Sequence, residues 1–178
     1  IGRRARTIAA PRLLPESAEP SRCDRSKLGF AHNQGPRQLA EGNSMTPEQI
    51  DLVHESAGRI APQLRALSTT FFERLFATHP EVRPMFAPNM SDQEEKFAES
   101  IAAIVEAIPD VEAFTRRARD LGRLHVVHGV VPEQYGAVGA VLLEVLAEYD
   151  ADWNAATADA WGAAYSALSD TMIESSRR

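Results

Sequence analysis

The sequence has few of the features that define several large classes of protein. Its lone cysteine is Cys23, so it has neither a disulfide framework nor a cluster of thiolate metal ligands. No apolar run approaches the roughly 18 residues of a membrane-spanning helix. The signatures of zinc metalloproteases, serine hydrolases and phosphate-binding loops are also missing. We therefore expect neither a membrane protein nor an enzyme of these three classes.

Charge is unevenly distributed along the 178 residues, whose net charge is −6. Residues 1–44 hold eight basic and four acidic side chains, a net +4, which leaves −10 for the remainder. A domain so acidic is a poor partner for nucleic acid, because phosphate contacts need a basic surface. The lack of disulfides fits a reducing compartment, and we expect a cytoplasmic location.

Residues 1–44 lack the apolar period of a helix or strand, and four prolines and four glycines interrupt them. Their longest apolar stretch, Ile8 to Ala10, ends at Pro11 and is too short for the core of a secretory signal. We expect this segment to be disordered or a non-native extension. Met45 opens the patterned part of the chain, so the predicted domain spans 45–178.

From Met45 onward the apolar residues follow a helical period. Thr46 and Pro47, with Gln49 three residues after the cap, are typical of a helix start. Further apolar stripes at helical spacing are separated by helix-breaking or helix-opening signals at Pro62, Pro80, Pro84, Pro109, Gly129 and Pro132. No stretch alternates as a strand does. The prediction is an all-α fold with about six to seven main helices.

Two polar residues, Gln93 and His125, occupy positions in apolar stripes. Burying an amide or an imidazole without a partner costs a few kcal/mol, so each needs one. The helical pattern alone favours a core histidine that is hydrogen-bonded to a backbone carbonyl. The alternative is a metal ligand, since neutral imidazole is the commonest one in proteins. His128, one turn from His125, could share a small ion, but no third ligand lies near in sequence.

The order of the motifs resembles that of globins, in particular bacterial single-domain haemoglobins and the haem domain of flavohaemoglobins. The resemblance covers essentially all of residues 45–176. It rests on TFFERLF at 70–76, HPEVRPMF at 79–86, MSDQ at 90–93, Lys96-Phe97, LGRLH at 121–125, Gly129-Val130, Tyr135, Val138-Gly139 and AWG at 160–162. It implies a globin fold whose helices sandwich one haem b, an iron protoporphyrin IX, and it makes His125 an expected iron ligand.

The resemblance also implies roles for individual residues. His125 matches the proximal ligand that binds the iron, and Phe86 matches the phenylalanine that wedges against the porphyrin. Gln93 matches the distal position, from which an amide donates a hydrogen bond to a bound diatomic molecule. Phe97 is expected to line the distal pocket, and Val130 to contact the porphyrin edge on the proximal side.

Three further positions complete this comparison. Lys96 is expected either to reach a haem propionate or to be solvated, and Tyr135 matches a tyrosine beside the proximal imidazole. Phe72 stands where the family usually has tyrosine, which removes one hydrogen-bond donor from the distal pocket.

The resemblance places Ser176 where the family has a proximal glutamate. Glu174 lies two residues earlier, and a shifted helix end would bring its carboxylate to that position. Without such a glutamate the proximal histidine is less electron-donating.

These features favour reversible binding of dioxygen or another diatomic gas, such as carbon monoxide or nitric oxide, at a five-coordinate iron, for oxygen storage or delivery. The alternative is a nitric-oxide dioxygenase or a peroxidase-like enzyme, which we expect to need a separate reductase. A sensor role is less favoured, because we expect no output segment after the globin part. A haemless helical regulator is also less favoured, because it does not explain why Gln93 and His125 face inward. We expect a monomer or a homodimer.

Overall fold

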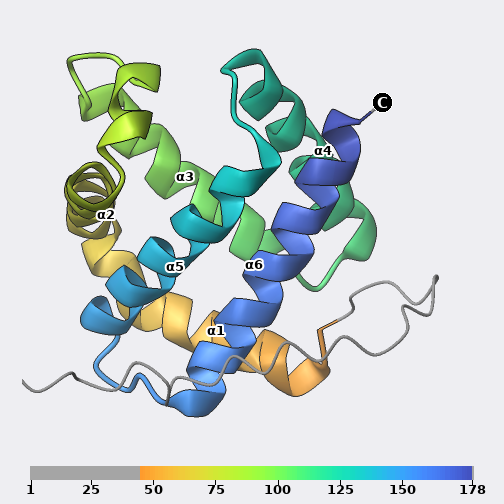
Figure 1. Cartoon of the computed structure of the whole chain (residues 1–178). Coiled ribbons are helices and arrows are strands. Elements are labelled where there is room, and N and C mark those ends of the chain that lie inside the picture. Colours follow the sequence, from red (N-terminus) through yellow and green to blue (C-terminus); the bar gives the residue numbers. More distant parts are fainter. Residues whose placement is uncertain (1–44, 178) are drawn as a thin grey trace, which may run out of the picture. The chain divides into compact units, whose positions relative to one another are not determined.

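The computed structural model describes residues 45–177, and all the regular secondary structure in this part of the chain is helical (Figure 1). The six α-helices and two 3₁₀ segments are α1 (Pro47–Ile60), η2 (Ala61–Gln63), α2 (Leu64–Thr78), η3 (Pro80–Met85), α3 (Ser91–Ala107), α4 (Val111–Val127), α5 (Pro132–Tyr149) and α6 (Ala155–Ser176). The predicted all-α fold, with about six to seven main helices, is confirmed. The expectation for residues 1–44 lies outside the described residues.

The helix boundaries follow local signals in most places. Thr46 caps α1 in a capping box, because its hydroxyl accepts from the Gln49 backbone N–H while the Gln49 side chain accepts from Thr46. Asn154 caps α6 in a similar way, with its side-chain oxygen accepting two backbone N–H groups. After α4, Gly129 takes a positive φ of 79°, which ends the helix as glycine commonly does.

Two boundaries differ from the sequence pattern. Pro62 does not open α2 directly but lies in the 3₁₀ turn η2, and α2 begins at Leu64. Ser91 and Asp92 have the residue types of a helix cap, but Ser91 is already the first residue of α3, and Met90 stands at the cap without a side-chain hydrogen bond. Such shifts of one or two residues are usual at helix ends, where α and 3₁₀ turns have similar energies.

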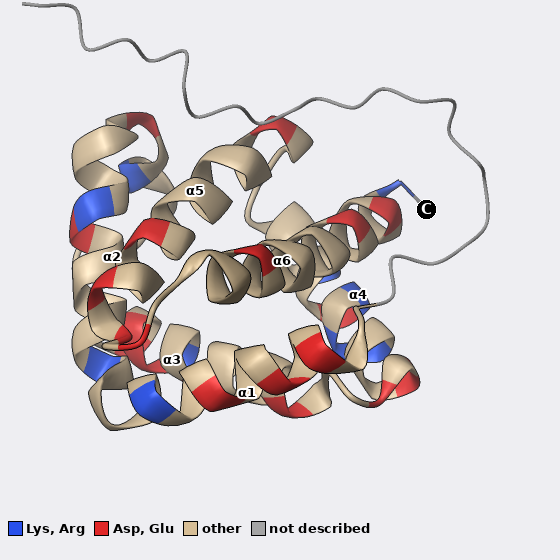
Figure 2. Ribbon diagram, turned by 90° about the horizontal axis from the view of Figure 1, so that it is seen from below, with Lys and Arg blue, Asp and Glu red and all other residues tan. Residues whose placement is uncertain are grey.

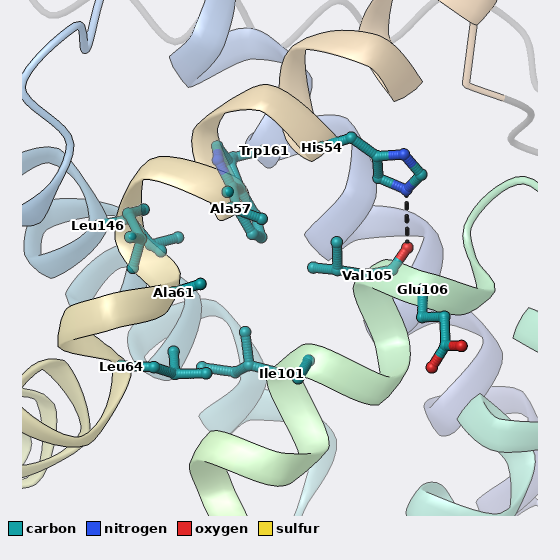
Figure 3. Close-up of a pocket in the computed structure, with 12 residues that line it drawn as sticks. His54, Ala57, Ala61, Leu64, Ile101, Val105, Glu106, Leu146 and Trp161 are labelled. Atoms are coloured by element: carbon teal, nitrogen blue, oxygen red, sulfur yellow. Dashed lines mark hydrogen bonds between the residues drawn. The ribbon is translucent and has the colours of Figure 1, made fainter.

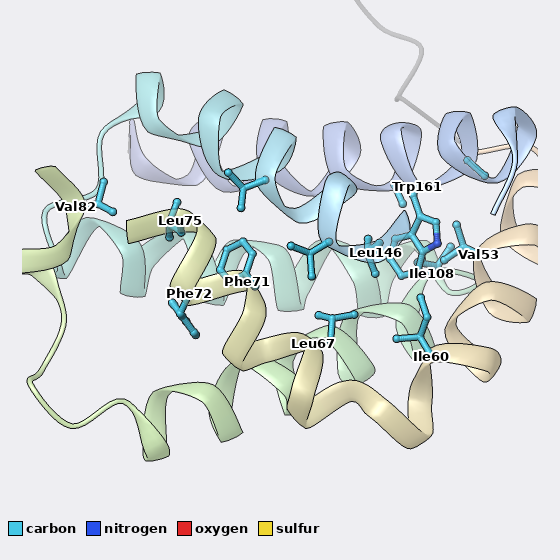
Figure 4. Packing of buried hydrophobic residues seen from close by; sticks show 14 residues of the cluster. Val53, Ile60, Leu67, Phe71, Phe72, Leu75, Val82, Ile108, Leu146 and Trp161 are labelled. Carbon is cyan, nitrogen blue, oxygen red and sulfur yellow. The ribbon is translucent and has the colours of Figure 1, made fainter. Parts of the chain in front are cut away.

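The core lies where the helices cross, and its largest buried cluster draws on α1, α2, η3, α5 and α6, with Ile108 just after α3 (Figure 4). Partly buried residues of α3 and α4 pack against it. Trp161 joins α6 to α1 in this cluster, because its indole N–H donates to the Ser56 hydroxyl at 2.9 Å and both residues are buried. Helix α6 packs against α4 as well as α1. The α4 contact is close at Gly122, where a Cβ would lie 2.7 Å from the Met172 carbonyl oxygen.

Charged side chains lie on the outer faces of these helices. Acidic residues follow α1, whereas α4 carries Arg116, Arg117, Arg119 and Arg123 (Figure 2). Within residues 45–177, no single helix is long and apolar enough to cross a membrane. The bent pair α4 and α5, which meet at 115°, reaches that length and composition only when taken together.

Candidate haem site

A large apolar cavity opens between the helices, with a volume of about 740 Å³. This volume falls within the ~300–1,000 Å³ that ligand and cofactor pockets typically enclose. The cavity walls come from α2, η3, α3, α4, α5 and α6. All eight residues that the sequence singled out line it: Phe72, Phe86, Gln93, Lys96, Phe97, His125, Val130 and Tyr135.

His125 projects into the cavity from the last turn of α4. Its Nδ1 lies 2.9 Å from the Leu121 carbonyl oxygen, one helical turn earlier. Because a carbonyl only accepts, Nδ1 carries the proton and donates, and in the neutral ring Nε2 keeps its lone pair. Within residues 45–177 no hydrogen bond involves Nε2. The core-histidine interpretation thus accounts for one ring nitrogen, and the other remains available to a ligand in the cavity.

The surroundings of His125 favour the neutral imidazole. Burial lowers its pKa, and the neighbouring His128 lowers it further, although the hydrogen bond to Leu121 opposes both effects. Neutral imidazole is the form that binds a metal. A hydrogen bond from one ring nitrogen to a backbone carbonyl, as His125 makes to Leu121, fixes the tautomer and ring orientation in metal-binding histidines.

The turn after α4 places Val130 beside His125. The Val130 backbone N–H donates to the His125 carbonyl at 3.0 Å, and Gly129 between them supplies the left-handed residue that such a turn needs. Val130 then packs with Tyr135 in a small cluster of its own. The His125 and Tyr135 rings lie 6.0 Å apart between centroids. Burial raises the pKa of Tyr135, so its hydroxyl stays protonated.

Aromatic rings form part of the cavity wall built by α2, α3 and the residue after η3. The Phe72 ring lies 5.5 Å from the Phe86 ring and 5.2 Å from the Phe97 ring, both edge to face. Phe97 also stacks on Phe71 at 4.4 Å. Phe72 is 4% exposed. This position therefore presents an apolar ring to the cavity where a tyrosine would present a hydroxyl.

Gln93 and Lys96 line the cavity from the first two turns of α3. Gln93 is half-buried, and no hydrogen bond within residues 45–177 involves its amide, which leaves two donors for a ligand. Lys96 is exposed, and no salt bridge in this part of the chain involves it. Gln93 and His125 come from different helices, α3 and α4, which both contribute to the walls of this one cavity.

The end of α6 bears on the missing proximal glutamate. The helix continues regularly to Ser176, whose hydroxyl donates to the Ile173 carbonyl at 2.6 Å. Glu174 is exposed, and neither Glu174 nor Ser176 lines the cavity. The structure therefore shows no helix shift that would bring a carboxylate to His125.

Several cavity residues were not singled out from the sequence. Met85, Gln134 and Tyr165 line the cavity, and the Gln134 side-chain nitrogen lies 3.7 Å from the Met85 sulfur. The Tyr165 hydroxyl donates to the Tyr135 backbone carbonyl at 2.6 Å, and burial raises its pKa. Tyr165 lies one turn beyond Trp161 in the last apolar stripe, which was the available signal. The sequence carried no signal for Gln134 as a cavity residue, because its side-chain oxygen accepts from the Val131 backbone N–H at the start of α5, as a capping residue does.

The residues present fit a flat apolar cofactor held by one axial ligand. Within residues 45–177 no three histidine, cysteine or acidic side chains gather as metal ligands. A single imidazole in an apolar cavity does not hold a bare ion, but it suits an iron already coordinated by a porphyrin. Fold and site together define an all-helical protein built around a prosthetic group of this kind.

Comparison with known proteins identifies the family. The globin family model matches residues 69–172. The flavohemoprotein of Deinococcus radiodurans is 35% identical over 134 residues, which are 72% of this chain and 33% of that protein. The flavohemoprotein of Rhizobium meliloti is 32% identical over 136 residues, with the same shares. The chain belongs to the globin family, whose members bind haem and diatomic gases, and it spans about a third of the length of these relatives.

Solved structures agree on the fold. A bacterial globin from Campylobacter jejuni matches with a TM-score of 0.67 and 27% identity, over 74% of this chain and 96% of that one. The haemoglobin of the botfly Gasterophilus intestinalis matches with a TM-score of 0.68 over 75% of this chain and 100% of its own. At 13% identity the latter likeness concerns the fold alone.

Proposed function

We propose that the protein binds haem b in the large cavity, with His125 as the proximal ligand, and that it binds dioxygen reversibly for storage or delivery. The observation that carries this proposal is the state of His125. Its Nδ1 is committed to Leu121 and its Nε2 faces the cavity unpartnered, while burial lowers its pKa. The imidazole is thereby held in the tautomer that coordinates iron through Nε2.

The remaining wall residues have distinct parts in this proposal. Haem supplies an iron atom that takes up a diatomic molecule reversibly. Gln93 is the distal donor, because its amide is free to hydrogen-bond to that molecule. Phe72, Phe86 and Phe97 exclude water from the same pocket, since their rings offer it no hydrogen-bond partner. An amide is a poor iron ligand, so we expect five-coordinate ferrous iron in the unliganded protein.

The edges of the cavity would position the porphyrin. Val130, in the turn after α4, would contact its proximal edge, and Tyr135 packs beside His125. Lys96 is exposed at the cavity rim with no acidic partner within residues 45–177, so its ammonium is free to pair with a propionate. Leu124 is 57% exposed although it lines the cavity, which a bound porphyrin explains.

A nitric-oxide dioxygenase or peroxidase-like enzyme is the second candidate. Similarity to flavohemoproteins favours it, and such an enzyme would draw electrons from a reductase partner. Two features of the site favour simple gas binding instead. Phe72 offers no hydroxyl to the bound molecule, and no carboxylate reaches His125 to make it more electron-donating.

Mixing the oxygenated protein with nitric oxide separates these candidates. The test supplies an artificial reductant and follows the return of the oxygenated spectrum over many cycles. In a gas-binding protein, nitric oxide consumes the oxygenated form once, and the oxygenated spectrum returns slowly. Sustained rapid turnover would overturn the storage proposal in favour of the enzyme. The unliganded ferrous spectrum tests the open site, and a six-coordinate spectrum would contradict it.

A further inference from the structure

The chain between η3 and α3, residues 86–90, belongs to no helix, yet it connects two side chains of the ligand pocket. Phe86 stands at its start, and Gln93 follows its end in the first turn of α3. Residues 87–89 are exposed, so burial does little to order their backbone. The groups that hold this segment therefore decide where Phe86 and Gln93 lie.

The Arg83 guanidinium binds the backbone of this segment. Its Nη1 donates to the carbonyl oxygens of Phe86 at 3.1 Å and Ala87 at 3.2 Å, and its Nη2 donates to the Pro88 carbonyl oxygen at 3.3 Å. One side chain thus satisfies three consecutive carbonyls, which the rigid fork of guanidinium donors allows. The guanidinium carbon also lies 4.9 Å from the centre of the Phe76 ring, a cation–π contact that steadies it.

Two common roles of an arginine do not account for this arrangement. Arg83 lies in the last turn of η3, where a basic side chain is favoured because the final carbonyls lack partners. Only the Phe86 carbonyl belongs to that helix end, however, since Ala87 and Pro88 lie beyond it. Within residues 45–177 no salt bridge involves Arg83, so no ion pair explains its position.

The other end of the segment is anchored to α2. The Thr69 hydroxyl donates to Glu94 Oε2 at 2.9 Å, and the Glu94 backbone N–H donates to the Met90 carbonyl oxygen at 2.8 Å. Gln93 lies directly before Glu94 in α3. The anchor to α2 therefore fixes one side of Gln93, and Arg83 fixes the path of the chain that leads to its other side.

We propose that Arg83 is a positioning residue for the ligand pocket. By holding the backbone of residues 86–88 it fixes the Phe86 ring and the direction in which the chain enters α3, and so the placement of the Gln93 amide. The proposal rests on the proposed function for the ligand that this amide meets. The Phe86 ring lies 5.3 Å from the Phe76 ring, so the guanidinium and both rings form one packed unit. Without the guanidinium the exposed segment keeps more conformational entropy, and the two pocket side chains sample several positions.

Hydrogen exchange of backbone amides, measured on the full chain, tests whether Arg83 orders the segment. The Phe86 and Ser91 amides are the reporters, because the first donates to the Arg83 carbonyl at 3.2 Å and the second to the Asn89 side chain at 3.1 Å. Arg83→Met removes every donor and keeps the unbranched stem. We expect roughly 10- to 100-fold faster exchange at both reporters, the effect of losing a hydrogen bond to a charged group, and unchanged rates in α6. Arg119→Met is the matched control, since Arg119 is exposed on α4 and does not line the cavity, and it should leave both reporters unchanged.

The carbon monoxide complex tests whether this order reaches the distal amide. The infrared band of bound carbon monoxide responds to the hydrogen-bond donors around it, so it should broaden or split in Arg83→Met. In a Gln93→Leu background the same substitution should leave the band unchanged, because the donor that it displaces is gone. Arg83→Lys keeps a charge beside the Phe76 ring but not the fork, so its exchange rates and its band should fall between those of wild type and Arg83→Met.

Unchanged exchange at Phe86 and Ser91 in Arg83→Met would overturn the positioning role, as would equal acceleration in α6, which indicates general destabilisation. A band change that persists in Gln93→Leu would contradict action through the amide. Should Arg83→Met fail to fold, Arg83→Lys decides the same question, since wild-type exchange and a wild-type band in that variant would overturn the role of the fork. A protein that forms no carbon monoxide complex contradicts the proposed function, whereas the exchange rates still decide whether Arg83 orders residues 86–88, so the two failures are distinguishable.

Discussion

Restoring a hydroxyl at position 72 offers a quantitative test of the distal pocket. Phe72 is 4% exposed and its ring meets the Phe86 and Phe97 rings at 5.5 and 5.2 Å, so a tyrosine hydroxyl there has few protein partners. A bound diatomic molecule gives it one. A hydrogen bond of this kind contributes about 0.5–1.5 kcal/mol net, which corresponds to about 2- to 13-fold slower dioxygen release from Phe72→Tyr.

Stopped-flow displacement of dioxygen by carbon monoxide measures this rate directly. Phe76→Tyr is the matched control, because the Phe76 ring lies 5.8 Å from the Phe72 ring but does not line the cavity. We expect Phe76→Tyr to release dioxygen at the wild-type rate. Equal rates in wild type and Phe72→Tyr, or equal slowing in both variants, would refute the assignment of Phe72 to the ligand pocket.

Three further predictions concern the distal amide, helix packing and acid stability. Gln93→Leu removes the distal donor, and the same displacement assay should show about 2- to 13-fold faster dioxygen release. Gly122→Ala places a methyl group 2.7 Å from a backbone carbonyl of α6 and should cost ~1–3 kcal/mol in urea unfolding, whereas Gly162→Ala, which meets open space, should not destabilise. The Arg59 guanidinium lowers the pKa of Asp150 from 3.8 to about 2, so this pair stabilises the fold above pH 3.8 and its contribution is lost as pH falls through about 2. Asp150→Asn should flatten acid unfolding in that window, and an unchanged profile would contradict the pairing.

Elements set by local chemistry were predictable from the sequence. The capping box at Thr46, the helix end at Gly129 and the start of α5 at Pro132 each depend on residues a few positions apart. The exact start of α3 was not predictable, because helix ends fray and a cap residue type does not fix the boundary to within one residue.

Contacts between distant segments were beyond the sequence pattern. Ser56 and Trp161 meet across 105 positions, and nothing in either local sequence specifies that bond. The hydrogen bond from His54 to the Val105 carbonyl, which joins α1 to α3 (Figure 3), depends on the same kind of information. The residues of the cofactor pocket were easier to predict from the sequence, because burying polar residues in apolar stripes is costly unless a partner in the pocket satisfies them.

The proximal role of His125 is the central claim, and the Soret absorption of haem-reconstituted protein tests it most directly. We predict that wild type shows the spectrum of histidine-ligated five-coordinate ferrous haem. His125→Gly should lose that spectrum, and added imidazole should restore it by occupying the vacated space. His128→Ala, one turn away and also lining the cavity, is the control and should keep the wild-type spectrum. An unchanged spectrum in His125→Gly would contradict the account.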